Sequence, residues 1–269
     1  MKARGESGGP VVQSATIPLM RRSLEQRLDQ MSVRMDQREL KAGDTNLTYG
    51  TLVPKAPAPE GGYPLIVGLH YGTTQEPGLS PYFGLGYVGQ LVFPALESLN
   101  AVIVAPDAPE FSWAHPDSEA AVLAVVAQVK KDHPINEKHT LVTGFSMGGS
   151  GAWYLGATHP EMFRAAIPMA ALPITTAVRT RAEAQAARKA LDSGTDWATP
   201  LLRMPLYVIH SRADETVPIE PLEQAVQTLK GRGADITTAF IDDVPHHLVP
   251  GFVDALSDAA PWIRGVWER

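Results

Sequence analysis

A serine flanked by glycines is the feature of this sequence that most directly indicates chemistry. Residues 144–148 read Gly-Phe-Ser-Met-Gly, with Ser146 at the centre, directly after a β-branched run and directly before a helix-like segment. On such a strand-to-helix turn the hydroxyl is held clear of the sheet, and the start of the helix offers free N–H groups and a positive dipole end. Glycines fit there because a Cβ on either side would collide with the neighbouring strand or helix. We therefore predict that Ser146 is a nucleophile.

Two later positions can supply the groups that a serine nucleophile needs. A hydroxyl is a poor nucleophile at neutral pH, so it requires a general base and a residue that orients the base. Asp214 follows one predicted strand, and the pair His246 and His247 follows the next one. Because the carboxyl ends of parallel strands share one edge of a sheet, we expect an acid and a histidine to meet Ser146 there. Asp107, at the same edge but before the serine in the chain, is a fallback acid.

The elements that must position these side chains follow a βαβ pattern. From residue 64, short β-branched runs alternate with longer amphipathic ones, which predicts a mostly parallel, buried sheet. The expected strands are 64–70, 101–105, 140–144, 165–169, 206–210 and 236–241, with 46–53 as an earlier antiparallel strand. The expected helices are 117–131 with Asp117 as N-cap, 147–159, 220–230, and a last one from about 251 with a kink at Pro261.

Two segments are longer than ordinary connections, namely 71–93 and 174–202. The first is rich in glycine and proline, and the second is alanine-rich and helix-like over 181–191. Long insertions at the carboxyl ends of strands wall the binding crevice in sheets of this kind. We therefore expect a short helical insertion near 174–202, and each long segment either walls the crevice or is a surface embellishment.

The N-terminal part is expected to lie outside the sheet. Its apolar residues recur at spacings of four, four, three and four, which predicts an amphipathic helix docked on the body. These residues are Met20, Leu24, Leu28, Met31 and Met35. We expect residues 1–45 to be a tail plus this helix, and 46–269 to form a single domain, because no linker rich in Pro, Gly or Ser divides the sheet region.

The composition excludes several classes of function. The 269 residues carry a net charge of −6 and a pI of about 5.7, which argues against a nucleic-acid partner and against a basic membrane-surface helix. Zero cysteines exclude disulfides, a cysteine nucleophile and thiolate metal sites. No apolar run approaches the ~18–20 residues of a membrane span, and no secretory apolar region is visible in the first 30 residues, so we expect a cytoplasmic protein.

Three segments resemble the α/β-hydrolase superfamily. They are Gly-Phe-Ser-Met-Gly-Gly with a following Trp153, Ile-His-Ser-Arg-Ala-Asp-Glu-Thr-Val-Pro at 209–218, and Val-Pro-His at 244–246. Over roughly 60–269 the chain is similar to the serine esterases grouped as phospholipase/carboxylesterase and feruloyl-esterase-like enzymes. The resemblance implies a mostly parallel central sheet with helices on both faces, and it makes Asp214 the triad acid. The resemblance also implies His246 as the base, because Phe252 and the pair Trp262 and Ile263 fit the family's spacing better from His246, and His247 stays the alternative.

An oxyanion hole needs two backbone donors aimed at the developing charge. One should be the N–H of Met147, the residue after the nucleophile. The other should come from the loop after an early strand, where relatives read His-Gly-x and this chain reads His70-Tyr71-Gly72, so Tyr71 and Gly72 are both candidates. His70 itself ends a buried strand and is expected to be structural.

The resemblance implies hydrolysis of a small-molecule carboxylic ester through an acyl-enzyme, with a triad of Ser146, His246 and Asp214 and with no cofactor or metal. Two alternatives stay open: a peptidase or thioesterase that uses the same triad, and a catalytically silent binding protein on the same scaffold. Gly84-Leu-Gly86-Tyr-Val-Gly89 matches a dinucleotide-binding motif. That motif must directly follow the first strand, and this one does not, so we expect no nicotinamide cofactor.

Aromatic residues near the predicted site are expected to be core rather than pocket. They are Tyr71, Tyr82, Phe83, Trp113 and Trp153.

Overall fold

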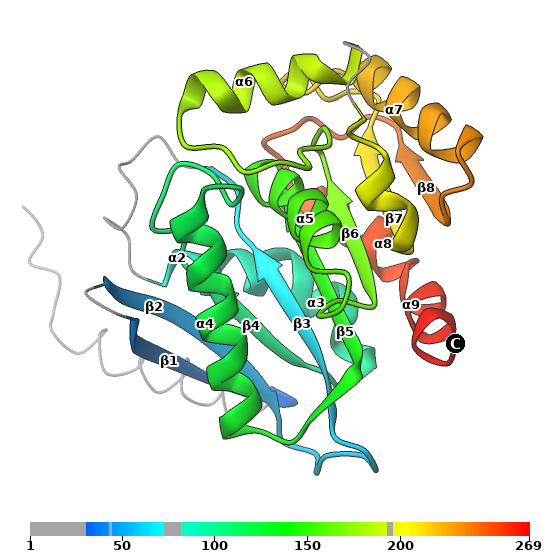
Figure 1. The fold of residues 1–269 in the computed structure, drawn as a ribbon. Coiled ribbons are helices and arrows are strands. Elements are labelled where there is room, and N and C mark those ends of the chain that lie inside the picture. Colours follow the sequence, from blue (N-terminus) through cyan, green and yellow to red (C-terminus); the bar gives the residue numbers. More distant parts are fainter. Residues whose placement is uncertain (1–30, 43–44, 73–81, 193–195) are drawn as a thin grey trace, which may run out of the picture.

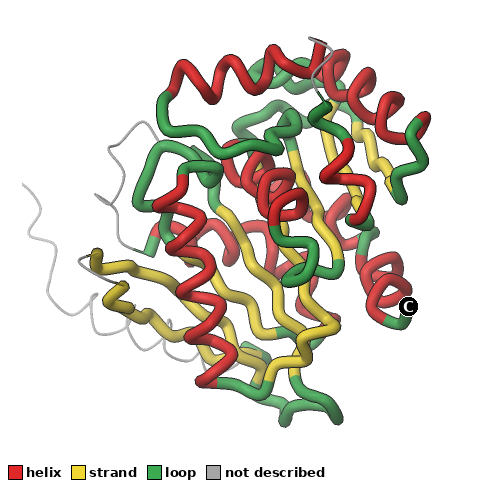
Figure 2. Tube along the Cα trace, viewed as in Figure 1, coloured by secondary structure: helices red, strands yellow, loops and turns green. Residues whose placement is uncertain are grey.

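The computed structural model describes residues 31–42, 45–72, 82–192 and 196–269. Its centre is an eight-stranded sheet with the order β1-β2-β4-β3-β5-β6-β7-β8. β2 runs antiparallel to β1 and β4, and all other neighbouring strands are parallel. Helices cover both faces of the sheet (Figures 1 and 2). This is the α/β-hydrolase fold predicted from the sequence.

The strands are β1 Val33–Ala42, β2 Thr45–Pro54, β3 Tyr63–Leu69, β4 Val102–Pro106, β5 Ile135–Phe145, β6 Ala165–Met169, β7 Leu206–Ser211 and β8 Ile236–Ile241. The α-helices are α2 Phe83–Tyr87, α3 Phe93–Leu96, α4 Pro116–Asp132, α5 Met147–Thr158, α6 Arg181–Lys189, α7 Ile219–Gly231, α8 Val253–Ser257 and α9 Ala260–Trp267. One π-helical turn, Val88–Val92, and short 3₁₀ turns complete these elements. Within the described ranges, no helix has both the length and the apolar character needed to cross a lipid bilayer.

The core consists of two apolar layers, one on each face of the sheet. Alternate residues of β3 belong to different layers: Leu65 and Val67 lie in one, and Ile66 lies in the other. Buried residues of α4, α5 and α7 cover the first face. Buried residues of α2, α3, α8 and α9 cover the second. The fully buried strands explain the continuous β-branched runs in the sequence.

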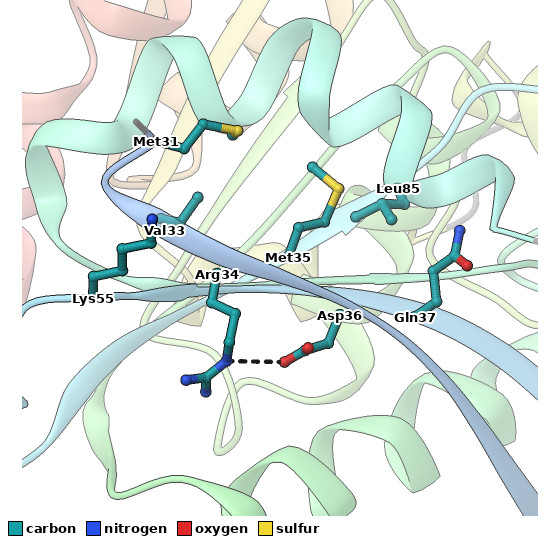
Figure 3. A pocket seen from close by; sticks show the side chains of 8 residues that line it. All are labelled: Met31, Val33, Arg34, Met35, Asp36, Gln37, Lys55 and Leu85. Carbon is teal, nitrogen blue, oxygen red and sulfur yellow. Dashed lines mark hydrogen bonds and ion pairs between the residues drawn. The ribbon is translucent and has the colours of Figure 1, made fainter. Parts of the chain in front are cut away.

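The prediction for the N-terminal region is wrong where the structure describes it. Residues Val33–Ala42 form edge strand β1 instead of a helix, so the sheet begins at Val33 and not at residue 46. A spacing of four residues places side chains on one face of a helix, but it also does so on one face of a strand. Figure 3 shows Met31, Val33 and Met35 on the same side of β1, where they line a cavity with Leu85. The earlier part of the predicted stripe, residues 20–28, lies outside the described residues.

The described part of the long 71–93 segment contains α2 and a π-helical turn. Two further expectations need correction. The side chain that caps α4 is His115, whose Nδ1 accepts the N–H of Asp117 (3.2 Å), because Pro116 occupies the first turn of the helix. The C-terminal segment is not one kinked helix: α8 ends at Ser257, and α9 begins at Ala260 with Pro261 in its first turn.

Candidate active site

Ser146 lies on a strained turn between β5 and α5. Its φ of 55° and ψ of −112° are unfavourable for a residue with a side chain. The turn packs so tightly that a Cβ at Gly144 would lie 2.2 Å from the carbonyl oxygen of Gly148. A Cβ at Gly148 would lie 1.9 Å from the carbonyl oxygen of Leu69 on β3. The two glycines of the motif are therefore required by the close approach of α5 to the sheet.

Three side chains from separate loops meet at this turn. His246 Nε2 lies 2.8 Å from Ser146 Oγ, and His246 Nδ1 lies 2.6 Å from Asp214 Oδ2. The other oxygen of Asp214 accepts the N–H groups of Thr216 (3.0 Å) and Val217 (2.7 Å). The Asp214 side chain is fully buried, whereas that of His246 is 12% exposed. The carboxylate thus fixes the proton on Nδ1 and leaves Nε2 as an acceptor facing the hydroxyl.

The structure separates the two adjacent histidines. The His247 side chain is 80% exposed and lies 3.3 Å from Glu215, so it points away from Ser146. The neighbouring Asp243 has a φ of 58°, and this turn precedes the pair. His246 is therefore the histidine that faces the hydroxyl.

The carboxylate of Asp107 is hydrogen-bonded to groups outside the Ser146 site. One of its oxygens accepts the hydroxyl of Thr48 (2.6 Å) and the N–H of Tyr82, and the other accepts the N–H of Gly84 (2.8 Å). The carboxylate holds the start of α2 against the end of β4, so the fallback acid has a structural role. Gly84 is needed there because a Cβ would lie 2.6 Å from the carbonyl oxygen of Pro106. The glycine motif of 84–89 thus begins α2 and does not follow a strand.

The loop after β3 lies against the start of α5. A Cβ built on Gly72 would lie 3.7 Å from both Cβ and Sδ of Met147. Among the described residues, the N–H groups of Met147, Tyr71 and Gly72 donate no hydrogen bond. Free donors from two elements therefore lie beside Ser146, as an oxyanion hole requires, and Tyr71 and Gly72 both remain candidates for the second donor.

Two buried histidines support the site without reaching the serine. His70 donates from Nδ1 to the carbonyl of Tyr71 (2.7 Å) and accepts the N–H of Ala108 at Nε2 (3.0 Å). His210, whose place within a buried strand gives no functional signal in the sequence, donates from Nε2 to the carbonyl of Val217 (2.8 Å) behind Asp214. Burial lowers the pKa of both imidazoles, so both are neutral. His70 is structural, as its position at a strand end predicts.

The two tryptophans near the site are core residues, as expected. Trp113 and Trp153 are fully buried, and their indole N–H groups donate to the carbonyls of His70 (2.9 Å) and Ala171 (3.2 Å). Phe111 lines the cavity that also contains Met147 and Ser150. No periodic pattern distinguishes it in the sequence, because it lies in the loop between β4 and α4.

One group of possible metal ligands lies within the described residues. Ligand atoms of Glu110, His115 and Asp117 lie within 4.8 Å of one another. Nδ1 of His115 is already used to cap α4, and Asp117 is in the first turn, where the helix dipole favours carboxylates and disfavours cations. Capping explains this group, and we assign no metal to it.

The fold is that of the α/β-hydrolases. Residues 106–219, somewhat less than half of the chain, match the model of the Esterase family, described as "Putative esterase". Feruloyl esterase C of Emericella nidulans is 28% identical over 125 residues, which cover 44% of this chain and 43% of the relative. The aligned part thus spans less than half of the curated relatives.

Solved structures match over more of the chain. A thermostable esterase aligns with a TM-score of 0.62 and 24% identity, over 86% of this chain and 62% of that one. A ferulic acid esterase aligns with a TM-score of 0.67 and 18% identity, over 88% of this chain and 100% of that one. At these identities the matches establish the fold, and the chemistry must be argued from the residues.

Proposed function

We propose that this protein hydrolyses carboxylic esters through an acyl-enzyme formed on Ser146. The observation that carries the proposal is the chain of short contacts from Ser146 through His246 to Asp214, at 2.8 and 2.6 Å. A neutral imidazole in hydrogen-bonding contact with a hydroxyl is the arrangement that activates a serine. The match of residues 106–219 to the Esterase family supports ester chemistry.

In the first half-reaction, His246 Nε2 takes the proton of Ser146 as Oγ attacks the carbonyl carbon. The resulting imidazolium keeps its Nδ1–H on Asp214, whose charge stabilises it. The N–H of Met147 and that of Tyr71 or Gly72 stabilise the oxyanion. The C–O bond to the alcohol then breaks, and His246 gives its proton to the leaving oxygen.

In the second half-reaction, water replaces the alcohol. His246 takes a proton from the water as its oxygen attacks the acyl carbon, and a second oxyanion forms in the same place. When this intermediate collapses, the proton returns to Ser146 Oγ and the carboxylic acid leaves. Both half-reactions use the same base and the same donors, and neither requires a cofactor or a metal ion.

The test is a Ser146→Ala variant assayed with a short p-nitrophenyl ester. It should fold like the wild type and lose nearly all turnover. A Ser257→Ala variant is the matched control, because within the described ranges that hydroxyl donates only to the carbonyl of Val253 in its own helix (2.9 Å). Retained turnover in Ser146→Ala would refute the proposal.

A substrate panel separates the proposal from its rivals. Methyl ferulate belongs in the panel because curated relatives are named feruloyl esterases. Amides and thioesters of the same acyl groups test peptidase and thioesterase activity. Failure of a fluorophosphonate to label the wild-type protein would favour a silent binding scaffold.

A further inference from the structure

Two cavities border the nucleophile on the side covered by α6. The smaller, of about 120 Å³, is lined by Ser146 itself, by Leu172 and Val217, and by Arg188 of α6. The larger, of about 280 Å³, shares Ser150 and Arg188 with the first. The shared lining makes one region that begins at the nucleophile and continues under α6. This region is therefore open to one part of a substrate that reacts at Ser146.

One face of α6 turns four residues toward the larger cavity: Arg181, Ala184, Gln185 and Arg188. Their spacing of three, four and seven residues puts them on one side of a helix. The hydroxyl of Thr180 caps the helix by accepting the N–H of Glu183 (3.1 Å). Figure 1 shows α6 across the top of the molecule, above α5 and the end of β6. The face of α6 that lines the larger cavity therefore carries two guanidinium groups.

The positive charge of the arginines that line these cavities is not balanced by acidic residues in the lining. No acidic residue is among those described as lining either cavity. Arg188 is exposed, and it has no hydrogen bond or ion pair within the part of the chain that the structure describes. The protein atoms around its guanidinium lower its pKa by partial desolvation, but an arginine stays protonated in proteins. By contrast, Arg212, which is also exposed, pairs with Glu223 at 2.9 Å.

An arginine that lines the cavity of the nucleophile and has no counter-ion among the described residues is available to an anionic group of the substrate. The planar guanidinium can bind a carboxylate through two parallel N–H donors. Arg181 adds a second positive charge, and it is held over the ring of Phe111 at 5.2 Å. Because Arg188 lines the same small cavity as Ser146, a bound carboxylate would lie only a short chain away from the ester carbonyl.

We propose that Arg188 determines specificity, and that the preferred substrates are esters that carry a free carboxylate a few bonds from the scissile ester. The inference rests on the proposed function and names its substrate class. The carboxylate can belong to the acyl part, as in a half-ester of a dicarboxylic acid, or to the alcohol part, as in an ester of a hydroxy acid. Both place the same anion on Arg188, and the experiment distinguishes them.

The test compares each charged ester with its neutral amide. For the acyl side the pair is monomethyl glutarate and methyl glutaramate, and for the alcohol side it is 4-acetoxybenzoate and 4-acetoxybenzamide. The readout is the ratio of kcat/KM for the carboxylate to kcat/KM for the amide. The wild type should show a ratio of about 3 to 10 for one of the two pairs, because the charge-assisted hydrogen bond forms with an exposed arginine and solvent screens it.

Three variants locate the source of that ratio. Arg188→Gln should bring it to about 1, and Arg188→Glu should invert the preference. Lys189→Gln is the matched control, because it removes one positive charge from the same helix at an exposed position that lines neither cavity. Lys189→Gln should keep the ratio of the wild type. Circular dichroism and melting temperature establish that the variants are folded.

The two proposals fail differently. If neither pair shows a ratio above about 1 in the wild type, or if Arg188→Gln leaves the ratio unchanged, this inference is overturned, while an inactive Ser146→Ala variant still supports the esterase. Turnover of these esters by Ser146→Ala overturns the proposed function instead.

Discussion

Replacing Gly148 with alanine tests whether the tight turn positions the site. The added Cβ would lie 1.9 Å from the carbonyl oxygen of Leu69, 2.6 Å from its carbonyl carbon and 2.8 Å from the carbonyl oxygen of His70. A carbon and an oxygen need about 3.3 Å, so the end of β3 and the start of α5 must separate by roughly 1.4 Å. All three atoms belong to the backbone, which no rotamer change can move out of the way.

That separation acts on stability and on activity. Overpacking of a dense core typically costs about 1–3 kcal/mol, and we expect the upper end because β3 is buried on both faces. The displaced carbonyl of His70 belongs to the peptide bond that carries the N–H of Tyr71, so a candidate oxyanion donor moves as well. A shift of about 1 Å at a reacting centre can cost about 100-fold in rate, and kcat should fall by that order.

Urea unfolding measures the first effect, and kcat per fluorophosphonate-titrated site measures the second. Gly86→Ala is the control, because nothing lies within 4 Å of a Cβ at this position in α2. It should be neutral or stabilise by up to about 1 kcal/mol. A Gly148→Ala protein with wild-type stability and kcat would refute the account of the turn.

Three further predictions concern acidic and histidine residues. Asp214→Asn should leave the fold intact and lower kcat by about 10⁴-fold, because an amide neither holds the Nδ1 proton nor stabilises an imidazolium; kcat within tenfold of wild type would contradict this. His246→Gln should remove nearly all turnover, whereas His247→Gln should leave kcat/KM within about twofold; the reverse order would exchange their roles. Burial lowers the pKa of His70 and His210 below the ordinary 6.5. Just below pH 6.5, the unfolded chain therefore binds protons at these two histidines, whereas the folded protein leaves both imidazoles neutral. Stability should therefore be full above pH 6.5 and fall as the pH drops below it, by at most about 1.4 kcal/mol per pH unit for each histidine. Urea unfolding at about pH 7.5 and 5.5 checks this, and a His70→Gln variant should show a shallower fall; equal stability of the wild type at both values would contradict the buried neutral state.

The strands that carry the site could be predicted because burial on both faces demands continuous β-branched runs. β6 and β8 match the predicted 165–169 and 236–241, and Ser146, Asp214 and His246 lie at the strand ends as expected. The proximity of the three side chains follows from that topology alone. Their catalytic roles stay predictions until activity is measured.

Other features depended on contacts that the local sequence does not encode. The strand at Val33–Ala42 is fixed by pairing with β2, and this pairing overrides a helix-like spacing. The helix at 181–189 was predictable from its composition, but its docking over Ser146 depends on packing between distant segments. Arg188 therefore shows no functional signal until the fold places it beside the nucleophile.

The central claim is that Ser146 becomes covalently acylated during turnover. The most direct measurement is acid quenching during hydrolysis of p-nitrophenyl butyrate, followed by mass spectrometry of the intact protein and of the peptide that contains residue 146. The account predicts one butyryl group per chain, on Ser146, and none in Ser146→Ala. An adduct on another residue, or undiminished turnover by the Ser146→Ala protein, would contradict it.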